Sequence, residues 1–136
     1  MSYKFLEHTA DVKFKAEGKS VEDVFVSCAG ALNETIRGDI KILEQEERVI
    51  DVKGDDFESL LYNFLEEFLF LLDSEGFLCA GVKEIKIDEG NFKLEAVLVG
   101  DKAENYKFTN DVKAVTYNDM FVKKDNEWKA QVVLDV

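Results

Sequence analysis

The segment from residue 57 to residue 72 restricts the fold more than any other part of this sequence. Its apolar residues recur at helical spacing and make a wide stripe along a predicted helix. They are Phe57, Leu60, Leu61, Phe64, Leu65, Phe68, Leu69, Leu71 and Leu72. In its second half, apolar residues lie nearly all round the helix, so we expect that half to be buried. Asp55 or Asp56 can cap the N-terminus, and Gly76 is the expected C-terminal stop.

A second apolar stripe predicts an earlier helix. Ser20 is the expected N-cap, Asp23 makes an acidic variant of the capping box, and Gly38 is the expected stop. The apolar positions between them are Val21, Val24, Phe25, Cys28, Ala29, Leu32 and Ile36. Cys28 lies on this stripe, and neither it nor Cys79 has a partner at CxxC spacing. We therefore expect two reduced core thiols in a cytosolic protein.

The remaining elements are predicted as strands, from alternating apolar and polar residues and from the turn residues between them. Residues 3–6 and 12–16 come before the first helix, and residues 48–53 lie between the helices. The later strand candidates are 82–87, 92–98, 112–122 and 128–134, with turns at 88–91 and 124–127 and a loop or ragged strand over 101–111.

The order of these elements predicts an α+β fold. A strand–helix–strand–strand run over residues 48–99 interrupts a first such run made of residues 12–37 and 112–135. We therefore expect two such modules, one inserted in the other, with two main helices packed on antiparallel or mixed sheet. Length and the terminal run of strands exclude a TIM barrel or a doubly wound sheet. The expected boundaries, within a single domain of residues 1–136, are about 1–38 plus 110–136 for the outer module and about 39–100 for the inserted one.

The charge balance narrows the functional classes. The 136 residues include 17 basic and 29 acidic side chains, a formal net charge of −12, and 46% of them are hydrophobic. That hydrophobic content supports a real core and argues against disorder. Direct binding to nucleic acid is disfavoured, because it needs clustered Lys and Arg. An acidic chain favours solubility, cations or a basic partner.

Neither a membrane span nor a secretion signal is expected. The longest apolar run, residues 68–72, is far short of the roughly 20 residues that a span needs. The first residues lack the charged-then-apolar pattern of a signal peptide. These features predict a cytoplasmic protein without membrane contact.

Familiar catalytic and phosphate-binding motifs are missing from the sequence, including GxxxxGK[ST], GxGxxG, GxSxG and HExxH. A single histidine is too few for a typical zinc site. An ordinary enzyme is therefore the weaker hypothesis.

Two short acidic segments lie near the two ends of the chain. Residues 7–11 (EHTAD) are either a tight turn or a ligand for a hard cation, since Mg²⁺ and Ca²⁺ prefer carboxylate and backbone oxygens. At the other end, Asp135 stands beside the α-carboxylate of Val136. This is either an ordinary strand end or a pair of carboxylates that repel unless a cation or a donor lies between them. If the nested topology brings Asp11 close, three acidic groups would share one metal ion.

A third segment, KAVTYND at residues 113–119, places polar and aromatic residues in a strand candidate. A strand with one solvated face is the simplest interpretation. Together with three other blocks, however, this segment makes the sequence resemble the archease family over essentially the whole chain. Those blocks are HTAD at residues 8–11, DDFESLLYNFLEEFLFL at 55–71 and VVLDV at 132–136.

The resemblance implies an accessory protein of the GTP-dependent tRNA-splicing RNA ligase that is not itself an enzyme. Archease-like proteins promote guanylylation of that ligase and let it turn over repeatedly. The resemblance also implies a divalent metal ion, Ca or Mg/Mn, held by Asp11 and Asp135 with Val136 as a further oxygen ligand. Lys113 matches a position that supports ligase activation.

One departure from the family pattern is visible in the third segment. Asn118 stands where many relatives have His, so any role there that needs an imidazole would be lost. His8 thus remains the only titratable ring and the second candidate for ligase activation.

Two alternative functions stay open. The chain is either an acidic adapter whose metal is purely structural or, least favoured, a small metal-dependent phosphatase or nuclease. Residues 39–76 carry 3 basic and 12 acidic side chains, a net −9, so most of the excess charge lies away from the candidate metal ligands. We interpret this excess as a source of solubility or of steering toward a basic partner.

Overall fold

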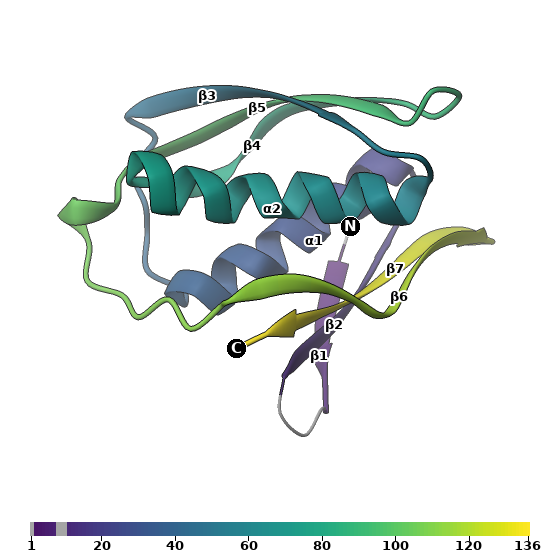
Figure 1. Ribbon diagram of the computed structural model, residues 1–136, viewed down its shortest axis with the longest axis horizontal. Coiled ribbons are helices and arrows are strands. Elements are labelled where there is room, and N and C mark those ends of the chain that lie inside the picture. Colours follow the sequence, from purple (N-terminus) through teal and green to yellow (C-terminus); the bar gives the residue numbers. More distant parts are fainter. Residues whose placement is uncertain (1, 8–10) are drawn as a thin grey trace.

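The computed structural model describes residues 2–7 and 11–136. Its strands are β1 (Ser2–Leu6), β2 (Val12–Gly18), β3 (Glu46–Lys53), β4 (Phe77–Asp88), β5 (Lys93–Lys102), β6 (Ala114–Asp125) and β7 (Glu127–Asp135). Its helices are α1 (Val21–Arg37), α2 (Phe57–Glu75) and a short 3-10 turn, η1 (Ala103–Asn105). Figure 1 shows three layers, with both long helices between two sheets.

The two sheets come from different parts of the chain. The terminal sheet, in the order β1-β2-β7-β6, joins strands from both ends of the sequence. The middle sheet, in the order β3-β5-β4, comes from the intervening residues. Every strand pair in both sheets is antiparallel. The predicted α+β fold, with one strand–helix–strand–strand module inserted in another, is confirmed, and β1 adds an edge strand to the outer module.

Both long helices contact both sheets. α1 packs on β2 and β4, and α2 packs on β6, β4 and β3. Leu60, Leu61, Phe64 and Leu65 of α2 are completely buried. A helix with a sheet on each side needs apolar residues on two faces, which explains why α2 carries so many. The predicted burial of its second half is right for Phe68 but wrong for Phe70, which is 55% exposed because it lies on the open side of the helix layer.

The ends of the helices follow their sequence signals. Ser20 accepts a hydrogen bond from the backbone N–H of Asp23, which is one of the two bonds of the predicted capping box, whereas Asp56 forms the full reciprocal capping box with Ser59. Gly38 and Gly76 end the helices with φ of 69° and 62°, a region that glycine enters without a Cβ penalty. Within residues 2–7 and 11–136, no helix is long and apolar enough to cross a membrane.

Strand boundaries differ most from prediction in β4. This strand begins at Phe77 rather than Val82, and its register with β5 shifts between Cys79 and Gly81 and again between Val82 and Glu84. Such bulges break the period-2 alternation of apolar and polar residues, so the sequence pattern underestimates the length of the strand. Phe92, predicted as the start of the next strand, belongs to the preceding turn and has a φ of 51°.

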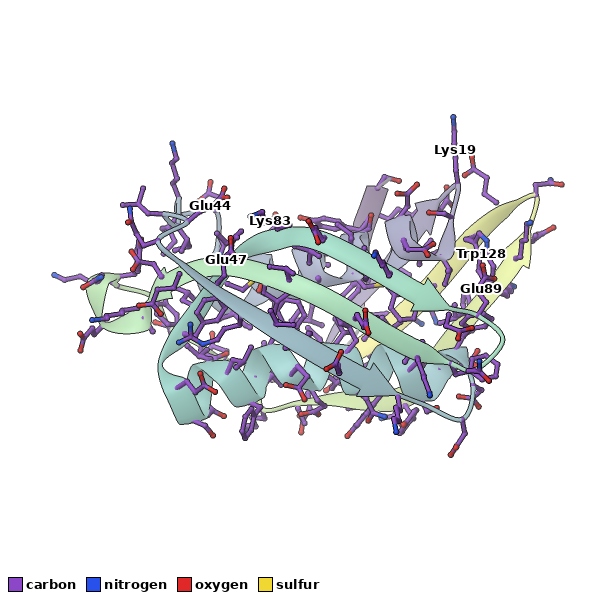
Figure 2. The ribbon with its side chains drawn as sticks, turned by 90° about the horizontal axis from the view of Figure 1, so that it is seen from above. Lys19, Glu44, Glu47, Lys83, Glu89 and Trp128 are labelled. Atoms are coloured by element: carbon purple, nitrogen blue, oxygen red, sulfur yellow. The ribbon has the colours of Figure 1, made fainter. Side chains whose placement is uncertain are left out.

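Charges on the solvent face of the middle sheet are partly paired. Figure 2 looks onto this face, where Lys83 of β4 lies beside Glu47 of β3, with a 2.8 Å ion pair between them. On the opposite face of β3, which is turned toward the helices, Arg48 binds Glu75 of α2 at 2.8 Å and lies over the ring of Phe77. Part of the acidic excess of the middle segment is therefore offset locally by neighbouring cations.

Candidate functional site

The pairing of β2 with β7 brings the two ends of the sequence together. Val12 is paired with Leu134, so the residues one step beyond, Asp11 and Asp135, lie at the same end of the terminal sheet. Val136, which the family resemblance implies as a further oxygen ligand, follows Asp135 directly. Figure 1 shows the C-terminus near the start of β2. The register thus brings the two aspartates and the terminal residue to one end of the sheet.

The start of β6 lies on the other side of Asp135. Ala114 is paired with Asp135, and the backbone N–H of Lys113 donates a 2.7 Å hydrogen bond to the Asp135 carbonyl oxygen. Three segments far apart in sequence, before β2, before β6 and after β7, therefore meet at Asp135. We call this region the chain-end site, made of Asp11, Lys113, Asp135 and Val136.

Core packing fixes the backbone of this site. Phe14, Val132 and Leu134, from the two strands that lead to it, have no exposed surface. Asp135 itself is exposed, and Asp11 is half-buried. The strands are thus anchored from the helix side while the acidic groups stay within reach of solvent or of a partner.

The donor set of the chain-end site suits a hard divalent cation. Two aspartate carboxylates and a terminal carboxylate offer only oxygen ligands, as Ca²⁺ and Mg²⁺ prefer. Across residues 2–7 and 11–136, no three His, Cys, Asp or Glu side chains gather into a group able to hold a metal. Since only two of the three acidic groups here are side chains, the terminal carboxylate would have to complete the ligand set.

Beside this site, β6 departs from regular strand pairing. Thr116 is paired with Val133, but the next β6 residue in register, Phe121, is paired with Gln131. The intervening residues 117–120 form what we call the β6 bulge. Asp119, inside it, has a φ of 52°, an uncommon conformation for a residue other than glycine. The strand predicted over residues 112–122 is therefore confirmed as β6, but its regular pairing with β7 is interrupted at its centre.

Side chains fasten the β6 bulge to its neighbours. Thr116 Oγ1 donates to the Val133 carbonyl at 2.8 Å and accepts from the N–H of Asn118 at 3.3 Å. The Gln131 amide donates to the Asp119 carbonyl at 2.8 Å. Asn118, the departure from the family pattern, therefore takes part in the bulge through its backbone N–H.

An ion pair links β2 to this bulge. Lys13 Nζ lies 3.7 Å from Asp119 Oδ2, and the Lys13 side chain is only 20% exposed. Sequence alternation placed Lys13 on the polar face of β2 but contained no signal for its partner, which is more than 100 positions away in the chain. These two charged residues flank the chain-end site and were missed by reasoning from sequence.

The remaining sequence candidates have different outcomes. His8 lies outside the described residues. Cys28 and Cys79 are free and buried, as predicted. Burial raises the pKa of the Cys28 thiol well above its usual range and that of Cys79 to about 11. Neither thiol is therefore suited to act as a nucleophile.

Comparison with known proteins gives a consistent relationship over nearly the whole chain. The model of the Archease protein family (MTH1598/TM1083) matches residues 3–136. The chain is 40% identical to Protein archease of Methanosarcina mazei, over 98% of this chain and 95% of the relative. It is 41% identical to Protein archease of Pyrococcus abyssi, over 98% of each chain.

A solved structure shows the same fold. The solution structure of Methanobacterium thermoautotrophicum protein 1598 matches with a TM-score of 0.79 and 32% sequence identity, over 98% of both chains. The shared fold, the family match and the similarity to named relatives agree over the same residues. This chain therefore belongs to the archease protein family.

Proposed function

We propose that this protein is an archease-type activator of the GTP-dependent tRNA-splicing RNA ligase. In this role it promotes guanylylation of the ligase and its multiple turnover during tRNA splicing, without being an enzyme itself. Family membership over residues 3–136 is the observation that carries the proposal. Cytoplasmic action and the absence of direct nucleic-acid binding belong to the same proposal.

The chain-end site is the proposed functional site of the molecule. Asp11, Asp135 and the Val136 carboxylate would hold one divalent ion, and the β2–β7 register supports this by bringing the two aspartates to one end of the sheet. Such an ion, when bound, supplies positive charge to phosphoryl oxygens, and nucleotidyl transfer is promoted mainly by positioned charge. The aspartates would hold the ion in a fixed position, because the anchored strands hold the aspartates.

Lys113 and His8 are the proposed residues for ligase activation. Lys113 is held beside Asp135 by its own backbone hydrogen bond, so its ammonium group is attached to a fixed point of the chain-end site. His8 belongs to the same HTAD block as Asp11. Because Asn118 replaces the usual histidine, His8 is the one imidazole available for proton transfer or ligand binding.

A reconstituted ligation assay under multiple-turnover conditions tests the proposal. We expect Asp11→Asn and Asp135→Asn to abolish most of the stimulation of the ligase and of its guanylylation, while circular dichroism shows an intact fold. Asp125→Asn is the matched control, because Asp125 is an exposed acid at the opposite end of the β6–β7 pair. Full stimulation by both chain-end variants would contradict the proposed role of the site.

The principal alternative is an acidic adapter with a purely structural metal, favoured by the net −9 on residues 39–76. Removing the metal distinguishes an ion that is used in ligase activation from one that is purely structural. Chelation followed by thermal unfolding should lower the melting temperature strongly if the ion is structural, because its binding energy then contributes to folding. For a metal used in activation, we expect a small shift in melting temperature together with loss of ligase stimulation.

A further inference from the structure

Two tyrosines form a stacked pair on the surface, away from regular strand pairing. Tyr62 of α2 and Tyr117 of the β6 bulge have ring centroids 4.3 Å apart and planes inclined by only 7°. Tyr117 is nevertheless 54% exposed. Because Tyr62 covers one face of the Tyr117 ring, the exposed area must come from the other face and the ring edge. A flat aromatic surface is therefore presented to solvent.

The backbone holds this aromatic surface in place. Tyr117 is the first residue of the β6 bulge. The bulge is held to β7 by the hydrogen bond from Thr116 to the Val133 carbonyl and by the one from Gln131 to the Asp119 carbonyl. Bulges commonly turn a side chain away from the direction that a regular strand would give it. Here the bulge turns Tyr117 onto Tyr62 of α2, beside which β6 runs (Figure 1). A ring held in this way loses little conformational entropy on binding, so the entropic cost of a contact to it is small.

Negative charges of nearby carboxylates act on both tyrosines. Burial and then the negative charges of Asp56 and Asp55 raise the pKa of Tyr117. Burial and then the charge of Glu66 raise the pKa of Tyr62. The stacked pair is thus an electron-rich aromatic surface within a negative potential, which attracts cations.

The same charges argue against other occupants. Nucleobases stack well on tyrosine, but their phosphates would be repelled by the neighbouring carboxylates. A second copy of this chain would bring a further net charge of −12 to the contact. A cationic side chain from a basic protein is the occupant that fits both the rings and the charges.

We propose that the open face of Tyr117 receives an arginine side chain of a basic partner protein, with Asp55 as the carboxylate opposite its charge. Asp56 is already engaged as the α2 cap, accepting from the Ser59 N–H at 2.8 Å, which leaves Asp55 for this contact. Arginine fits better than lysine, because a planar guanidinium stacks on an aromatic face while keeping its N–H donors for a carboxylate.

The inference rests on the proposed function only in naming the partner, which would be the RNA ligase. It adds a second contact that is separate from the chain-end site. Loss of this contact should weaken binding to the ligase but leave the activating chemistry intact at saturating concentration. Loss of a chain-end aspartate should do the reverse.

Equilibrium binding to the purified ligase, by isothermal titration calorimetry at two salt concentrations, is the first test. We expect Tyr117→Ser to raise Kd roughly 2- to 30-fold, the range from an exposed to a desolvated cation–π contact, and Tyr117→Phe to bind like the unmodified protein. Asp55→Asn should raise Kd several-fold and reduce its salt dependence. Controls are Phe70→Ser, at an exposed aromatic residue of α2 away from the pair, and Asp73→Asn, at an exposed acid of α2. Equal Kd values for the unmodified protein and Tyr117→Ser would overturn the inference.

A second test does not depend on the ligase. The Tyr117 ring resonances are followed by NMR during titration with a short arginine-containing peptide and with its citrulline counterpart. We expect saturable shifts with arginine only. No shift with either peptide, or larger shifts with an RNA hairpin, would overturn the inference. If the unmodified protein fails to bind or stimulate the ligase, the proposed function fails, and this titration alone decides the inference.

Discussion

A carboxylate oxygen of Glu58 on α2 accepts a 2.9 Å hydrogen bond from the backbone N–H of Val122 on β6. Glu66, two turns later on the same helix, accepts from the N–H of Val115 at 3.3 Å. β6 is an edge strand of the terminal sheet, so some of its N–H groups have no strand partner. The helix thus supplies acceptors to the open edge, which also protects the edge from pairing with another chain.

This relationship predicts a stability cost for losing the Glu58 carboxylate. Glu58→Ala should lower the free energy of unfolding by about 1.5–3 kcal/mol, the range for a hydrogen bond to a charged group. Glu58→Gln keeps an acceptor oxygen and should cost less. Urea unfolding measures both, and amide hydrogen exchange at Val122 should become faster in Glu58→Ala. An unchanged unfolding midpoint in Glu58→Ala would show that the bond adds no stability.

Gly100 in β5 is expected to tolerate no side chain. A Cβ at this position would collide with the carbonyl oxygen of Leu78 and lie 2.8 Å from the ring of Phe77. Gly100→Ala should therefore destabilise the protein by about 1–3 kcal/mol or more. Gly81→Ala is the matched control, because no atom beyond the adjoining residues lies within 4 Å of the corresponding Cβ. Thermal unfolding of the two variants compares them directly, and equal melting temperatures would contradict the crowding at Gly100.

Asp101 should give part of the stability a dependence on pH. The Tyr106 hydroxyl, donating at 2.7 Å, and the Lys102 N–H hold the pKa of Asp101 below its ordinary value of about 3.9. A lowered folded-state pKa contributes stability that is present above the ordinary value and is lost as pH falls through the lowered one. Tyr106→Phe should move the Asp101 pKa upward, as measured by NMR titration of its carboxyl carbon.

The same variant gives a second readout in unfolding experiments. The stability difference between the unmodified protein and Tyr106→Phe should be largest near neutral pH and should shrink below about pH 3.9. A difference that is constant across this range would mean that the Tyr106 hydroxyl acts only through its other hydrogen bond, from the N–H of Leu43.

The two thiols should be unreactive in the folded protein. With a pKa of about 11, Cys79 has roughly one thiolate in a thousand molecules at pH 8, and burial limits access to both cysteines. The extent of modification by iodoacetamide, measured by mass spectrometry, should therefore rise with urea in parallel with the fraction of unfolded protein. Fast modification of either cysteine at zero denaturant would contradict this.

Local features of the fold could be predicted because they depend on neighbours in sequence. Ser20 and Asp56 act as caps through hydrogen bonds to residues three positions later, and Gly38 and Gly76 end helices because only glycine enters their conformation without strain. The apolar stripe of α2 likewise follows from helical spacing alone. These features, together with the order of the strands, were sufficient to predict two nested modules.

Tertiary structure decided the features that depend on partners distant in the chain. Glu58 and Glu66 lie off the apolar stripe of α2, where helical spacing alone predicts solvent contact, but β6 lies alongside α2 and uses both as acceptors. The β6 bulge and the stacking of Tyr117 on Tyr62 were equally invisible, since alternation describes only regular strands.

The chain-end site likewise combines a feature that the sequence predicts with one that only the tertiary structure decides. The side chains of Asp11 and Asp135 and the expected main-chain carboxylate of Val136 made these residues candidates for a hard cation, because carboxylates are its preferred ligands. Only the antiparallel register of β2 with β7, set by burial of Phe14, Val132 and Leu134, brings the two aspartates to one end of a sheet. The sequence by itself determined the chemistry available to this protein, whereas packing decided which groups meet, since register depends on which side chains can be buried together.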